Sequence, residues 1–286
     1  MKTSIETNPG LVEESANDTP PSDHIRIVPL HSPKPKLTID EAAERREIGD
    51  GDLFDPGHVH APSNPKLTYR HGPLLTNVQV YIIYWGKLWG TNAASTSLMQ
   101  KLNQFFAAIL TSPAIDQLSE YSVPGKKIGH GSVIGNKIIT DNAPGKSITD
   151  AAIRTQLKSW IAHKVVPANN ANTLYFIYLD PGVVSIMGGS RSCQSYCGYH
   201  NNVGSVYYAV MPYPSCNGCL GGMSPLDALT GTSSHELCEA ITDPVPGTGW
   251  YDDVNGEIGD ICAWKFKNVA GFNVQLEWSN HQNKCV

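Results

Sequence analysis

The chain has 286 residues, with 21 Lys and Arg residues against 26 Asp and Glu residues and a formal net charge of −5. A hydrophobic fraction of 41% is enough to build a core, so a wholly disordered protein is excluded. The mildly acidic balance argues against a surface for nucleic acid or anionic lipid, because such surfaces need clustered basic residues. The best apolar run, Val78–Trp85, is far shorter than the roughly 18 residues that a membrane span requires.

Residues 1–65 form a separate, proline-rich segment, for which we expect a disordered leader or pro-segment. Half of the chain's 20 prolines occur by Pro73, and such runs cannot hold regular structure. A short charged helix over Ile39–Ile48 is the one element expected there. The first residues lack the apolar core of a secretory signal, so the chain is either cytoplasmic or has had its signal removed.

Strands and helices alternate after Tyr69, which predicts a sheet with helices packed on it. We expect strands over Val78–Trp85, Gly131–Thr140, Leu174–Leu179 and Val206–Val210. Helices are expected over Leu98–Leu110 and from an N-cap at Thr149 through Ile161. From Gly188 onward the chain reads mostly as Gly-, Cys- and Pro-rich loop, interrupted by one clear helix. The prediction is a single α+β domain over residues 66–286 with a loop-rich, disulfide-stapled C-terminal half.

All seven cysteines lie between Cys193 and Cys285. Clustering in a loop-rich region favours local disulfides and an oxidising compartment. The rival is a structural zinc site, since Cys216-Asn-Gly-Cys219 has CxxC spacing. Choosing partners by proximity, and the last pair as the remainder, predicts Cys193–Cys197, Cys216–Cys219 and Cys262–Cys285. Cys238 is left over as a free thiol.

The clear helix carries the main chemical signal. His235 and Glu239 stand at positions i and i+4, so both side chains can reach a single metal ion. Glu236 lies one step round the helix, where a carboxylate can take a proton from water. This is the pattern of the HExxH metallohydrolase helix, with Glu239 in the place of the second His. The alternative is an ordinary surface helix with acidic residues and a buried His.

This helix is expected to be short. Asp227, Thr232 or Ser233 can cap its start, and Pro244 ends it.

A second acidic segment follows and can supply a third metal ligand. Asp260 is the first choice and Glu257 a substitute, because a mononuclear site needs three protein ligands. Alternatively, Asp253-x-Asn255-x-Glu257 is an oxygen cluster of the kind that binds calcium, although it lacks the full twelve-residue loop. The plainest interpretation is a solvated turn around Asn255-Gly256.

Several ordered blocks give the chain a resemblance to a known family over residues 72–286. The blocks are Asn77-Val-Gln-Val-Tyr-Ile-Ile-Tyr-Trp-Gly-Lys87, Cys193-x-x-x-Cys197-Gly-x-His200, Cys216-Asn-Gly-Cys219, Ser234-His-Glu-Leu-Cys-Glu239 through Asp243-Pro244, Glu257-Ile-Gly-Asp-Ile-Cys262, and Gln275-Leu-Glu-Trp-Ser279. In this order they resemble the EXORDIUM-like, phosphate-induced protein family of extracellular plant proteins.

The resemblance implies a secreted protein linked to growth and cell walls, without an agreed reaction. It adds His200, which matches a family histidine, as a substitute third ligand. It also implies that Cys238 is a buried, unpaired thiol, since family members carry a small or aliphatic residue there. The proline-rich leader departs from the plant pattern and points to a microbial relative.

Two functions follow as hypotheses. The first is a secreted zinc-dependent hydrolase, a metallopeptidase with a zincin-like α+β fold that acts on a peptide or protein substrate. His235, Glu239 and Asp260 would hold the metal, and Glu236 would be the catalytic general base. The second is a non-catalytic extracellular module that binds cell-wall glycan or a protein partner.

The binding-module hypothesis relies on exposed aromatic side chains in the loop-rich half, which can stack on sugars. The candidates are Tyr196, Tyr199, Tyr213, Trp250 and Tyr251.

One further expectation concerns the leader. His58-Val59-His60 can place two imidazoles on one side of an extended strand and block an open metal position, which would make residues 1–65 an inhibitory pro-segment.

Overall fold

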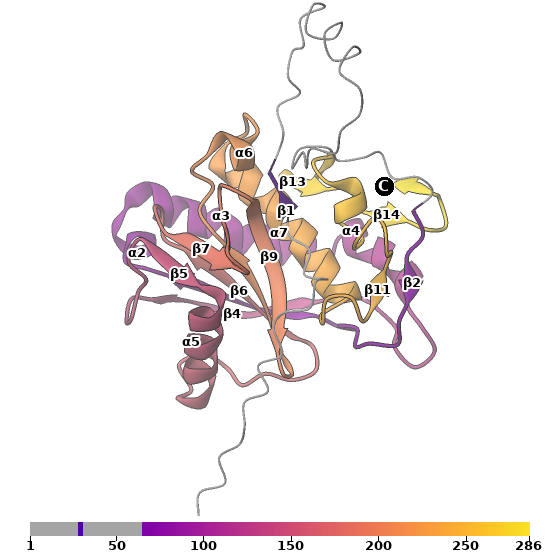
Figure 1. The fold of residues 1–286 in the computed structure, drawn as a ribbon, viewed down its shortest axis with the longest axis horizontal. Coiled ribbons are helices and arrows are strands. Elements are labelled where there is room, and N and C mark those ends of the chain that lie inside the picture. Colours follow the sequence, from indigo (N-terminus) through magenta and orange to yellow (C-terminus); the bar gives the residue numbers. More distant parts are fainter. Residues whose placement is uncertain (1–27, 31–64) are drawn as a thin grey trace, which may run out of the picture.

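The computed structural model describes residues 28–30 and 65–286 (Figure 1). The expected helix over Ile39–Ile48 and the His58-Val59-His60 motif lie outside the described residues. Of the predicted leader, residues 28–30 and residue 65 are described, and they include the two-residue strand β1 (Val28–Pro29). In the described part of the chain, no helix combines the length and the apolar character needed to cross a bilayer.

A six-stranded sheet in the order β1-β9-β10-β6-β3-β4 forms the framework. Its strands beyond β1 are β3 (Gln79–Trp85), β4 (Ser132–Ile139), β6 (Thr173–Leu179), β9 (Tyr196–Val203) and β10 (Val206–Met211). The four strands from β10 to β4 run parallel, and β9 is antiparallel to β10. The antiparallel end of the sheet therefore carries β9, with β1 along its outer edge.

Three long helices cover the two faces of this sheet (Figure 1). They are α3 (Ala93–Ile109), α5 (Asp150–Ala162) and α7 (Pro225–Thr242). Parallel neighbours require crossover connections, and α3 links β3 to β4 while α5 follows β4 on the way to β6. Because these two crossovers run in opposite directions along the sheet, right-handed connections place their helices on opposite faces.

Strands β3, β6 and β10 are buried on both faces, and alternate side chains enter two separate cores. Val80, Ile82 and Tyr84 of β3 pack with α3 and α7, whereas Tyr81 and Ile83 pack with α5. This two-sided burial explains why β3 is almost continuously apolar in sequence.

Short elements complete the described chain. They are β2 (Thr68–Tyr69), α2 (Leu88–Thr91), α4 (Pro113–Asp116), the 3₁₀ turn Gln117–Tyr121, β5 (Ser147–Thr149), β7 (Val184–Met187), β8 (Ser190–Arg191), α6 (Asn217–Leu220), β11 (Trp250–Tyr251), the 3₁₀ turn Asp260–Cys262, β12 (Phe266–Val269), β13 (Phe272–Gln275), β14 (Trp278–Ser279) and β15 (Lys284–Cys285).

The mixed helix-and-strand fold is confirmed, and so are the strands expected at β3, β4, β6 and β10. The N-cap at Thr149 is also confirmed, because its side chain accepts the Ala152 N–H. Two expectations were wrong. The region after Gly188 is not mostly loop, since it contains β9 and the β12–β13 hairpin. The main helix begins at Pro225 with Ser224 as its N-cap, so the expected caps Asp227, Thr232 and Ser233 all lie within the helix.

Candidate metal centre

The first part of the site lies on helix α7, which is buried within the molecule. The Ser224 hydroxyl accepts the Asp227 N–H, and Pro225 occupies the first helical position, so the helix starts with a strong cap. Every residue from Ala228 to Thr242 is buried. The helix packs between the sheet and the β12–β13 hairpin, so the polar side chains on its sides are enclosed rather than solvated.

His235 and Glu239 form a pair on one side of α7. The His235 Nε2 lies 2.8 Å from Glu239 Oε1, without the alignment that a hydrogen bond requires. The other ring nitrogen, Nδ1, lies 3.1 Å from the side-chain oxygen of Gln275 and 2.9 Å from its amide nitrogen. The Gln275 amide nitrogen donates to the Gly259 carbonyl oxygen, which fixes the amide orientation. With Nδ1 held by the Gln275 amide, Nε2 is the ring nitrogen that faces Glu239.

Strand β9 contributes His200, which lies among three glutamates. Its Nδ1 is 3.0 Å from Glu236 Oε2 and 3.5 Å from Glu239 Oε2. Its Nε2 is 3.2 Å from the Asp243 carbonyl oxygen and 3.6 Å from Glu257 Oε1. Both ring nitrogens therefore face acceptors, which suits a doubly protonated imidazolium.

The loop after β11 closes the site from the opposite side. Asp260 Oδ1 lies 4.0 Å from His235 Nε2, and Asp260 Oδ2 accepts the Glu257 N–H. The backbone at Gly259 presses against the helix pair, because an added Cβ would lie 2.9 Å from Glu239 Oε1 and from the His235 ring. A glycine is needed at this point for steric reasons alone, since its φ of −78° suits any residue.

The site holds an excess of buried acceptors. His200, His235, Glu236, Glu239 and Glu257 are fully buried, and the Asp260 side chain is 14% exposed. Within the described chain, no hydrogen-bond partner is present for either oxygen of Glu239 and Glu257, for Glu236 Oε1 or for His235 Nε2. Buried acceptors without donors are costly. A cation between them would remove that cost.

The pKa values of the site residues follow from burial and crowding. Burial would lower the pKa of His200, but Glu257 and Glu236 beside it hold that pKa well above its usual range. Burial would also lower the pKa of His235, but the neighbouring Glu239 raises it well above its usual range. For Glu239, burial is outweighed by the two imidazoles, which lower its pKa to about 2. Burial raises the pKa of Glu236 and of Glu257. A negative field that attracts protons in this way also attracts a divalent cation.

The structure brings the predicted ligand set together. Donor atoms of His235, Glu239 and Asp260 lie within 4.8 Å of one another, and a second group of the same compactness comprises His200, Glu236 and Glu239. The mixture of imidazole and carboxylate fits zinc better than calcium, which prefers all-oxygen sites. Of the two substitute ligands, His200 has acceptors at both ring nitrogens, and Glu257 lies near its Nε2, whereas Glu239 lies near its Nδ1.

The alternative calcium cluster is not assembled. Asp253 is 82% exposed and pairs with Arg70, whereas Glu257 is buried beside His200. Asn255 belongs to a turn in which Asp252 accepts the backbone N–H groups of Val254 and Asn255.

Three residues of the site were missed from sequence. Gln275 orients His235, as described above. Asp243 accepts three backbone N–H groups from the loop after α7, at Gly247, Thr248 and Gly249. Glu277 is buried near Cys238, and neither of its carboxylate oxygens has a hydrogen-bond partner in the described chain. The signal for Gln275 and Glu277 was their place in a polar–apolar alternation at the end of the chain.

The disulfide prediction was correct for one bridge and wrong for two. Cys262–Cys285 is present and Cys238 is a buried free cysteine. The other bridges join Cys193 to Cys216 and Cys197 to Cys219.

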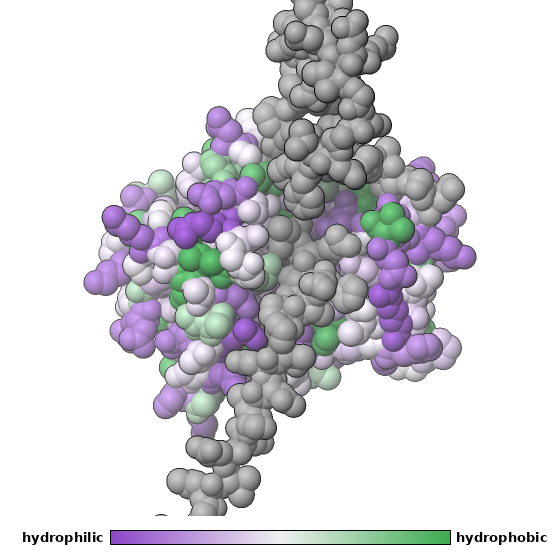
Figure 2. All heavy atoms as spheres, in the orientation of Figure 1, coloured by the Kyte–Doolittle hydropathy of each residue, from purple (hydrophilic) through white to green (hydrophobic). Residues whose placement is uncertain are grey.

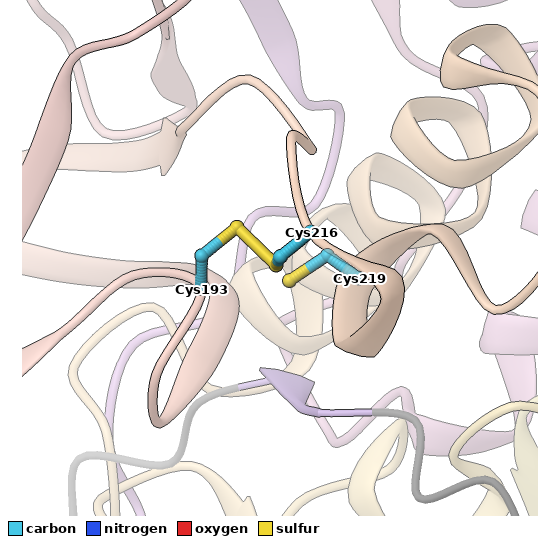
Figure 3. Close-up of side chains that lie close together, drawn as sticks. All are labelled: Cys193, Cys216 and Cys219. Atoms are coloured by element: carbon cyan, nitrogen blue, oxygen red, sulfur yellow. A yellow bond between two sulfur atoms is a disulfide. The ribbon is translucent and has the colours of Figure 1, made fainter.

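Figure 3 shows the first of these bridges next to Cys219, which lies on α6. Since α6 packs on β9, each cysteine meets a partner from the neighbouring element rather than from its own loop. The four sulfurs are tied up in disulfides, so the structural-zinc alternative has no thiolate to use.

The aromatic residues proposed to bind glycan are not exposed. Tyr196, Tyr199 and Tyr251 are buried, and Trp250 is half-buried with its indole N–H donated to the Tyr121 carbonyl oxygen. Tyr213 packs against the main core. On the face shown in Figure 2, hydrophobic side chains occur as small patches among hydrophilic ones. The binding-module hypothesis therefore loses the aromatic surface on which it relied.

No protein-family model matches the chain, and no curated protein matches it significantly.

Proposed function

We propose that the protein is a zinc-dependent hydrolase whose substrate is a peptide or protein, with a zincin-like arrangement of sheet and metal-binding helix. One observation carries the proposal: the donors of His235, Glu239 and Asp260 converge in a buried site where the acceptors lack hydrogen-bond donors. In this proposal these three residues hold the metal. A bound zinc would supply Lewis acidity for the scissile carbonyl and would acidify water.

Glu236 is the general base of the proposal. Its Oε2 is held 3.0 Å from His200 Nδ1, while Oε1 has no hydrogen-bond partner among the described residues and is free to accept a proton. Burial raises the pKa of this carboxyl, which brings it nearer to the range that suits a base at neutral pH. His200 positions the carboxylate and shares its charge, and the Asp243 carbonyl in turn orients His200.

Three disulfides within the C-terminal half support an extracellular setting, because such bridges persist in oxidising compartments. The resemblance to EXORDIUM-like proteins agrees with secretion, and membership of that family is part of the proposal.

The test uses the isosteric variant Glu236→Gln. Full-length protein loaded with zinc should cleave an unstructured protein such as casein, and the variant should retain the metal while its rate falls by about 100-fold or more. The control is Glu120→Gln, a change of the same kind away from the site. Equal rates for Glu236→Gln and wild type would refute the role of Glu236 as base.

A further inference from the structure

The outer edge of β9 is occupied by a piece of chain from far away in the sequence. Val28 lies opposite Gly198 and Pro29 opposite Tyr196 in an antiparallel pairing whose register shifts between the two residues. Figure 1 shows β1 alongside β9, close to α7. Val28 is only 2% exposed. A sheet edge offers unpaired N–H and C=O groups, and a two-residue strand uses only part of the edge that β9 provides.

Side-chain contacts hold the same three residues. The Pro29 carbonyl oxygen accepts the Trp264 indole N–H at 3.1 Å. Val28 packs with Cys197 and Cys219 in a small apolar cluster, with Leu30 at its border. Backbone pairing combined with pockets for individual side chains is how proteins recognise an extended peptide at a sheet edge.

This edge leads to the candidate metal centre. Gly198 and His200 are alternate residues of β9, so both face α7. An added Cβ at Gly198 would lie 2.6 Å from the Thr232 side chain, and His200 contacts Glu236. Because the pairing is antiparallel, a peptide that continues N-terminally from the position of Val28 runs along β9 towards His200, which lies about 7 Å further along the strand.

We infer that the outer edge of β9 is a binding site for an extended peptide and that Val28–Leu30 is its occupant from the same chain. The segment competes with any peptide that arrives from outside. Binding at this edge needs no metal, whereas naming the bound peptide a substrate rests on the proposed function.

The test frees the edge in the full-length protein and measures what then binds. In Val28→Asp, the buried apolar contact is replaced by a charge, so the segment leaves the edge. The probe is a fluorescein-labelled synthetic peptide with the sequence of residues 24–32, followed by anisotropy in the presence of EDTA. The matched control is Val254→Asp, because Val254 is 79% exposed. Because the segment loses the burial of one valine, Val28→Asp should bind the probe at least about tenfold more tightly than wild type. Val254→Asp should bind it no more tightly than wild type.

A second probe, with Asp in place of its own valine, should bind at least about tenfold more weakly to Val28→Asp. If Val28→Asp does not fold, Val28→Ala should give a smaller gain in the same direction. A folded variant with no gain, or no gain in Val28→Ala when Val28→Asp is unfolded, would overturn the inference and make β1 an ordinary structural strand. The outcome is separate from the hydrolase proposal. A probe that binds but is not cleaved by the zinc-loaded protein contradicts the proposed function alone.

Discussion

The His235 Nε2 and the Glu239 Oε1 lie 2.8 Å apart on successive turns of one buried helix, and neither atom makes a hydrogen bond within the described chain. Two donors held this close, with Asp260 facing them from the next loop, have the arrangement of ligands that share one ion.

Asp260, rather than His200, is expected to be the third ligand. Asp260→Ala should weaken zinc binding by more than the about 10–100-fold typical of an outer-shell partner, whereas His200→Gln should stay within that range. Competition with a chromophoric chelator measures both constants. Asp253→Ala is the control, since Asp253 is an exposed carboxylate of the same loop. If His200→Gln lost zinc while Asp260→Ala retained it, His200 would be the third ligand and Asp260 the outer-shell partner.

Gln275 is expected to act on the metal through His235. Gln275→Leu removes the amide group that contacts the imidazole Nδ1, so zinc affinity should fall by about 10–100-fold with all three ligands still present. The same chelator competition gives the value, and circular dichroism checks that the variant folds. An unchanged affinity in a folded variant would mean that the ring orientation is set by other contacts.

Gly259 is expected to tolerate no side chain. In Gly259→Ala, the added Cβ meets Glu239 Oε1 and the His235 ring at 2.9 Å, so the loop must move away from the helix pair and carry Asp260 with it. We expect zinc binding weaker by about tenfold or more, since ligand geometry is lost. Gly145→Ala is the matched control, because nothing lies within 4 Å of its added Cβ. Equal zinc affinity in the two variants would contradict the close packing at Gly259.

Glu277 is expected to make stability fall as pH rises. Burial raises the pKa of this carboxyl well above its usual range, so between its unfolded and folded pKa values the folded chain binds more protons than the unfolded chain. By linkage, the free energy of unfolding then decreases with pH across that window, by up to about 1.4 kcal/mol per unit. Glu277→Gln removes this dependence, because an amide keeps the shape without ionising. Urea unfolding of both proteins at pH 5, 7 and 9 measures the difference. A constant difference across this range would show that Glu277 ionises normally.

The local pattern of α7 was enough to predict its part of the site. Positions i and i+4 share a helix face whatever surrounds the helix, so His235 and Glu239 could be paired from sequence alone. Asp260 was expected near the helix because a mononuclear metal site needs a third protein ligand, and its Oδ1 lies 4.0 Å from His235 Nε2.

Other features depend on tertiary contacts that no local pattern encodes. Cys197 lies within β9 and meets Cys219 only because α6 packs on that strand, so proximity in sequence chose the wrong partners. The strand itself was missed because its cysteine, glycine and asparagine residues resemble a loop. Gln275 enters the site from the β12–β13 hairpin, 40 residues after His235.

The central claim is that the buried donors form a metal site, and metal content tests it most directly. Full-length protein is incubated with zinc, passed through gel filtration and analysed by mass spectrometry of the intact chain and by elemental analysis. The account predicts one zinc per chain in the wild type, none in His235→Ala, and one in His130→Ala, whose histidine is exposed and paired with Asp116. A wild-type protein that retains no zinc, or a His235→Ala variant that retains as much as the wild type, would contradict it.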